Sequence, residues 1–103
     1  MKIVKVTYSA KAEFVAENQS NIRNVMAELQ KINNPGILYH CCVGEDGISF
    51  THTAFFNSDE NEKVLLELPL FKHFQMELKA KGLTAPPKQE HLSFVGASKN
   101  LFN

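Results

Sequence analysis

The chain has 103 residues and carries 11 Lys and Arg against 11 Asp and Glu, so its formal net charge is zero. This balance argues against nucleic-acid binding, because proteins that contact phosphates usually show a basic excess. No apolar stretch approaches the ~20 residues that cross a membrane, and Met1–Lys5 lacks the pattern of a signal peptide. We therefore expect one domain over residues 1–103, located in the cytoplasm, with no nucleic acid or membrane among its partners.

The first predicted element is a strand over residues 3–9, where β-branched and aromatic side chains predominate. Residues 11–32 contain no Gly or Pro, and their apolar side chains recur at spacings of three, four and seven. This pattern predicts an amphipathic helix. The helix should end at residues 33–36, where a proline and a glycine follow two asparagines.

Two strands are predicted next, over residues 37–43 and 48–56, and the short turn between them favours an antiparallel hairpin. Pairing Val43 with Ile48 divides the hairpin between two faces and places Tyr39 opposite His52. The more apolar face, which we expect beneath the helices, carries Tyr39, Cys41, Val43, Ile48, Phe50, His52, Ala54 and Phe56. The other face carries Leu38, His40, Cys42, Ser49, Thr51, Thr53 and Phe55.

A second amphipathic helix should follow, because Asp59 and Glu62 have the spacing of a capping box. Pro69 lies inside the apolar pattern of this helix and is expected to kink or split it. Gly82 should end the helix, and a fourth strand is predicted over residues 88–96.

The resulting order, βαββαβ, predicts a ferredoxin-like α+β fold with two helices on one face of a four-stranded antiparallel sheet. The second face of the sheet is left uncovered. On that face Leu38 and Phe55 lie among hydroxyl side chains, which suits a contact with another sheet better than open water. We therefore expect a homodimer that forms through the open sheet face.

Three segments carry a family resemblance: Pro35-Gly36, the strand end Ala54-Phe55-Phe56-Asn57-Ser58, and Leu68-Pro69-Leu70-Phe71-Lys72-His73-Phe74. Together with the element order, they resemble the dimeric α+β barrel superfamily, and within it the antibiotic biosynthesis monooxygenase-like domains. The resemblance covers nearly the whole chain. It implies a dimeric α+β barrel, and for some members it implies oxygenation of quinol or polyketide compounds without a cofactor.

The chain departs from the active-site pattern of this family. Oxygenases of the family often have a Trp where Phe56 stands, at the end of the third strand. Haem-degrading members carry a His in the second helix, where residues 64–67 contain none. An Asn is common late in the first strand, where this chain has Thr7 and Tyr8. The resemblance thus implies fold and dimerisation more strongly than catalysis.

The helix-facing side of the hairpin offers a candidate catalytic pair, His52 and Tyr39. A histidine can serve as general base and a tyrosine as hydrogen-bond donor to a phenolic substrate. Loss of the substrate's proton would prepare it for direct reaction with oxygen, as the resemblance implies. The alternative interpretation is a buried histidine that is hydrogen-bonded to its neighbours.

Aromatic side chains near this pair are candidates for binding an aromatic small molecule, with His73 at the rim of the cleft. They are Phe50, Phe56, Phe71 and Phe74. The alternative is that these rings form plain core.

No cofactor or metal is expected, because the His and Cys residues lack zinc-site spacing and Cys41 directly precedes Cys42. Two functions remain open: a cofactor-independent monooxygenase, and a non-catalytic dimer that binds a ligand or a protein. RNA-recognition domains share the element order, but here only Tyr8 and Phe55 offer stacking rings and the net charge is zero.

Overall fold

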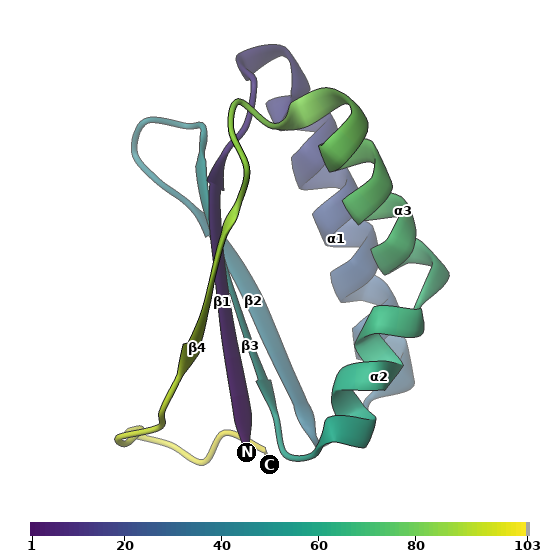
Figure 1. The fold of residues 1–103 in the computed structure, drawn as a ribbon. Helices are drawn as coiled ribbons and strands as arrows, with labels where there is room; N and C mark the ends of the chain where they lie inside the picture. Colours follow the sequence, from purple (N-terminus) through teal and green to yellow (C-terminus); the bar gives the residue numbers. More distant parts are fainter. Residues whose placement is uncertain (103) are drawn as a thin grey trace.

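The computed structural model describes residues 1–102 and shows one sheet with helices along one of its faces (Figure 1). The strand order is β2-β3-β1-β4, and every neighbouring pair is antiparallel. The predicted ferredoxin-like α+β fold is therefore confirmed. The strands are β1 (Lys2–Ser9), β2 (Ile37–Val43), β3 (Ser49–Phe56) and β4 (Lys88–Leu92).

The two predicted helical regions are present, and each contains more than one element. The first comprises a 3-10 turn, η1 (Ala12–Phe14), and α1 (Val15–Ile32); the second comprises α2 (Asp59–Glu67), α3 (Pro69–Glu77) and a π-helical turn, η2 (Leu78–Gly82). Asn33 ends α1 in the left-handed conformation, with φ of 53°. Its N–H donates to the carbonyl of Leu29 at 2.9 Å.

Pro69 splits the second helical region, as predicted. Leu68 is extended, with φ of −63° and ψ of 127°, and Pro69 begins α3. The residue before a proline avoids the helical conformation, whereas a proline at the first helical position loses no hydrogen bond. Consequently α2 and α3 meet at a bend, and both remain on the same side of the sheet (Figure 1).

The predicted capping box is wrong. Ser58 is the N-cap of α2, and its side chain accepts a hydrogen bond from the N–H of Asn61 at 3.3 Å. The helix begins one residue earlier than the predicted box requires, so that Glu62 lies outside the capping position. Glu62 instead accepts a hydrogen bond from Lys2 Nζ at 2.8 Å.

The hairpin register differs from the predicted one by two residues. Val43 pairs with Phe50 rather than with Ile48, because the turn extends further than expected. The side chain of Asp46 closes this wider turn by accepting hydrogen bonds from the N–H groups of Ile48 and Ser49, at 3.0 and 2.9 Å.

A shift of two residues leaves every side chain on its predicted face, because neighbours in a strand alternate between faces. His52 therefore still lies beneath the helices, where it is buried. Its neighbour on β2 is Cys41, however, and Tyr39 pairs with Ala54 instead. Tyr39 thus approaches His52 along a diagonal.

The fourth strand ends at Leu92, four residues earlier than predicted. Leu92 pairs with Ile3, close to the start of β1, so the chain beyond it has almost no strand left to pair with. Residues 93–102 then turn at the end of the sheet, toward the N-terminus (Figure 1).

An apolar row crosses all four strands on the open face. The pairing places Leu38, Phe55, Ile3 and Leu92 side by side. The next row on this face is polar and charged, and consists of His40, Thr53, Lys5 and Glu90. The open face therefore combines an apolar edge with a polar centre.

Residues 1–102 contain no helix that is long and apolar enough to cross a bilayer.

Candidate functional site

A cavity of about 470 Å³ lies between the sheet and the second helical region. Apolar side chains of β1, β3, α2 and α3 form most of its lining, including Val6, Ala54, Leu65, Phe71 and Phe74. Its size falls in the range of small-molecule sites, which are typically ~300–1,000 Å³ and mostly apolar with a few polar groups. The polar groups on the floor of this cavity come from three neighbouring strands.

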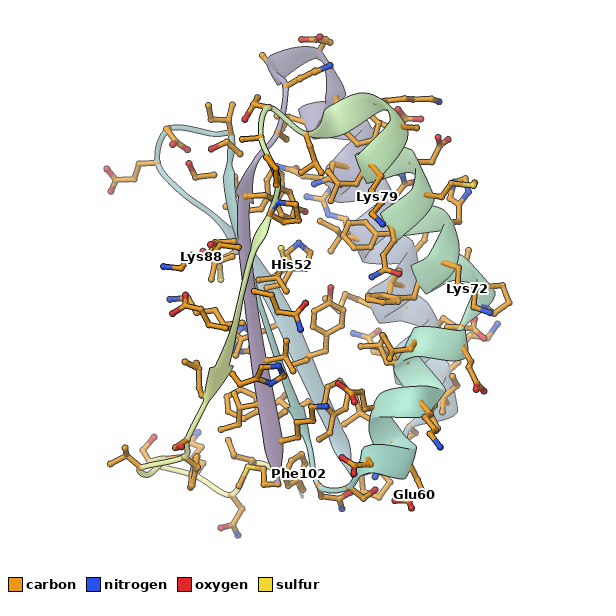
Figure 2. All side chains as sticks on the ribbon, viewed as in Figure 1. His52, Glu60, Lys72, Lys79, Lys88 and Phe102 are labelled. Atoms are coloured by element: carbon orange, nitrogen blue, oxygen red, sulfur yellow. The ribbon has the colours of Figure 1, made fainter. Side chains whose placement is uncertain are left out.

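The imidazole of His52 is at the centre of these polar groups, on the helix-facing side of the sheet (Figure 2). Its Nε2 lies 2.7 Å from the hydroxyl of Tyr8, and its Nδ1 lies 2.6 Å from the hydroxyl of Tyr39. The side-chain Nδ2 of Asn18, on α1, donates to the Tyr8 hydroxyl at 3.0 Å. The thiol of Cys41 lies 3.4 Å from Nε2.

These contacts fit either neutral tautomer of His52, because a tyrosine hydroxyl can both donate and accept. In one of the two arrangements, Tyr8 accepts from Asn18 and directs its own proton to Nε2 of His52. A neutral imidazole has one donor and one acceptor nitrogen, so in that arrangement Nδ1 is the protonated one. It donates to the Tyr39 hydroxyl, whose proton is then left to donate to a ligand in the cavity.

Burial shifts the titration of every ionisable member of this network in favour of the neutral form. It lowers the pKa of His52 from 6.5 to about 4. Burial also raises the pKa of Tyr8 and of Tyr39 above the usual tyrosine value, and it raises the pKa of the Cys41 thiol to about 12. The network is therefore uncharged at neutral pH.

The structure brings the predicted catalytic pair together, since Tyr39 and His52 are hydrogen-bonded in the cavity. Both ring nitrogens of His52 are engaged by tyrosine hydroxyls, however. In this arrangement His52 reaches a bound molecule through Tyr39 rather than directly.

The predicted aromatic residues separate into two groups. Phe56, Phe71 and Phe74 line the cavity, and the ring of Phe74 lies 5.3 Å from that of His52. Phe50 is not part of this lining; it is 2% exposed and stacks on Tyr8, with ring centroids 5.4 Å apart. His73 is exposed on α3 and also lies outside the lining, because its neighbours Phe71 and Phe74 occupy the inner side of the helix.

Sequence reasoning missed Tyr8 and Asn18. Tyr8 shares the helix-facing side of β1 with Val4 and Val6, which a period of two would have indicated. Asn18 is fully buried, and it lies four residues from Phe14 and four from Ile22, both of which are in the core. A polar side chain at such a position was the available signal for a buried hydrogen-bonding role.

No group of three or more His, Cys, Asp or Glu side chains within residues 1–102 is placed to hold a metal ion. Cys41 and Cys42 are both free thiols.

No protein-family model matches the sequence, and no curated protein matches it. Solved structures do match. An antibiotic biosynthesis monooxygenase has a TM-score of 0.77 at 13% identity, over 93% of this chain and 100% of its own. A candidate antibiotic biosynthesis monooxygenase from Bacteroides thetaiotaomicron has a TM-score of 0.82 at 10% identity, over 96% and 93% of the two chains.

A third similar structure is a mutant of SnoaB, a cofactor-independent oxygenase from Streptomyces nogalater. Its TM-score is 0.68 at 15% identity, and the match covers 96% of this chain and 98% of SnoaB. These matches show that the chain has the fold of the antibiotic biosynthesis monooxygenase structures, as the sequence predicted.

We expect the free energy of unfolding to fall as the pH is lowered from about 7 to about 4. The folded pKa of His52 lies below the unfolded value of 6.5, so the unfolded chain binds a proton that the folded chain excludes. The stabilisation is present above the unfolded pKa and is lost as the pH approaches 4. Of the unfolding free energy that is lost between these two pH values, His52 accounts for about 3 kcal/mol.

Urea unfolding gives the free energy of unfolding of the wild type and of His52→Gln at about pH 7 and about pH 4. The contribution of His52 is the difference between the two proteins in how much this free energy falls. The exposed residue His73 provides the control, and His73→Gln should keep the wild-type dependence. Equal pH dependence in the wild type and in His52→Gln would contradict the assignment.

Proposed function

We propose that the protein binds a phenolic or quinol small molecule in this cavity and oxidises it with dioxygen, without a cofactor. The observation that carries the proposal is the hydroxyl of Tyr39. It lies 2.6 Å from Nδ1 of His52, at the floor of an aromatic-lined cavity. With Nδ1 as the donor of this pair, the proton of the Tyr39 hydroxyl is directed at a ligand. The fold shared with SnoaB, which is named a cofactor-independent oxygenase, supports the same chemistry.

In this proposal Tyr39 is the catalytic residue. Its hydroxyl donates to the oxygen of the bound phenol and favours the ionised form, because a fixed donor is most effective where negative charge develops in a dry site. The neutral ring of His52 is a positioning residue, since it fixes the direction in which the Tyr39 hydroxyl points. Tyr8 and Asn18 hold the imidazole in the required tautomer.

The reaction is a four-electron oxidation of the ring. The phenolate transfers electrons to dioxygen, a C–O bond forms at a ring carbon, and the O–O bond then breaks. The second oxygen atom leaves as water with the hydrogen of that carbon and the proton of the phenol. For 1,5-dihydroxynaphthalene the products are 5-hydroxy-1,4-naphthoquinone and one water.

A non-catalytic ligand-binding dimer is the second candidate. It is favoured by the fact that both nitrogens of His52 are engaged and that its pKa is lowered to about 4. A residue in this state is a poor general base near neutral pH. Binding without turnover would then be the function of the cavity.

The proposal includes a homodimer through the open sheet face. The apolar row of Leu38, Phe55, Ile3 and Leu92 crosses that face beside polar side chains that a second sheet can pair with. Ile3 is already buried within the single chain, whereas Leu92 in this row and Phe94 just beyond it are exposed by 42% and 44%. Burial of such apolar side chains is the main favourable contribution to the free energy of association.

The enzymatic proposal predicts oxygen consumption with 1,5-dihydroxynaphthalene and a matching rise in quinone absorbance. We expect Tyr39→Phe to lower kcat/KM about 100-fold, because it removes the donor to the developing charge. His52→Gln should lower it about 10-fold through loss of positioning. His73→Gln is the matched control and should retain wild-type activity, since His73 lies outside the cavity lining.

Equal turnover in the wild type and Tyr39→Phe would contradict the enzymatic mechanism. Binding of the naphthol without any oxygen consumption would favour the non-catalytic dimer instead.

The dimer is tested by sedimentation. We expect the wild type to sediment at twice the chain mass, and Phe55→Glu to sediment as a monomer, because a carboxylate in the apolar row would be buried without a partner. Met76→Glu also replaces an apolar side chain by a carboxylate, but on the helical side of the molecule, where Met76 is 61% exposed. This control variant should remain a dimer. A wild-type protein that is monomeric at micromolar concentration would refute the dimer.

A further inference from the structure

Two charged side chains line the cavity, and they differ in whether their charge is compensated. Glu62 forms an ion pair with Lys2, at 2.8 Å between Oε1 and Nζ. Lys79 makes no ion pair or side-chain hydrogen bond anywhere in residues 1–102. The cavity therefore carries one positive charge that has no partner among residues 1–102.

Lys79 lies at the mouth of the cavity. It belongs to the π-helical turn η2, four residues beyond Gln75 of α3, so the two side chains share one face of the helix. Gln89 of β4 also lines the cavity, from the edge of the sheet. In Figure 2 Lys79 lies toward β4, whereas Lys72 projects from the outer side of α3.

The polar groups of the cavity thus fall into two sets at different places. The floor offers the Tyr39 hydroxyl as a hydrogen-bond donor, and the mouth offers an ammonium group with two side-chain amides. Aromatic and aliphatic side chains lie between them. Because Lys79 is exposed, it can contact an anion that keeps part of its hydration, so pairing costs little desolvation.

We propose that the ligand is an aromatic acid: a hydroxylated polycyclic ring with a carboxylate at the end distant from its phenolic hydroxyl. The hydroxyl contacts Tyr39, the rings contact Phe71 and Phe74, and the carboxylate contacts Lys79. Gln75 and Gln89 supply further donors at the mouth. This inference rests on the proposed function, because it places the phenolic end of the ligand on Tyr39.

Two probes that differ only in the carboxylate test the inference: 6-hydroxy-2-naphthoate and 2-naphthol. Isothermal titration calorimetry at neutral pH and low salt should give about 10-fold tighter binding of the naphthoate by the wild type. Lys79→Gln should abolish this preference while leaving the affinity for 2-naphthol unchanged. Added salt should reduce the preference, since the pair is partly exposed.

Lys72→Gln is the matched control, because it removes one positive charge from the outer side of α3, in the same helical region as Lys79. It should keep the wild-type preference. Equal affinity of the wild type for both probes, or an unchanged preference in Lys79→Gln, would overturn the inference and leave the proposed cavity function standing. Failure of both probes to bind would overturn the proposed function together with the inference.

Discussion

The two hydrogen bonds of the His52 imidazole determine the arrangement of this cavity. A polar ring beneath the helices is costly to bury unless both of its nitrogens are satisfied, and here Tyr8 and Tyr39 satisfy them from the strands on either side. Because β3 lies between β1 and β2, its central residue can reach both tyrosines at once. The strand order is thus what makes the network possible.

This network makes the floor of the cavity neutral, whereas the mouth of the cavity is charged. Burial keeps the imidazole, the tyrosines and the Cys41 thiol uncharged, so that the floor can hold a hydroxyl without an ionic competitor. The mouth opens between α3 and the edge strand β4, where Lys79 and two amides are in contact with solvent. An elongated aromatic molecule with different polar groups at its two ends fits this division.

The fold and half of the site could be predicted from the sequence, because the actual turn differs from the predicted one by an even number of residues and so keeps Tyr39 and His52 on the side beneath the helices. The register was wrong by two residues, since Asp46 closes a wider turn than the glycines alone indicate. Tyr8 and Asn18 were missed because their contacts depend on pairings 44 and ten residues apart along the chain. Helix periodicity likewise excludes His73 from the side that carries Phe71 and Phe74.

The proposed role of Tyr39 requires a neutral His52 that carries its proton on Nδ1 and donates it to the Tyr39 hydroxyl. Nuclear magnetic resonance of the ¹⁵N-labelled ring tests it most directly, since the shifts of the two nitrogens report both charge and tautomer. We expect one histidine that stays neutral down to about pH 5 with Nδ1 protonated, and whose Nδ1 chemical shift changes in Tyr39→Phe. A His52 ring that is charged at neutral pH, or protonated on Nε2, would contradict it.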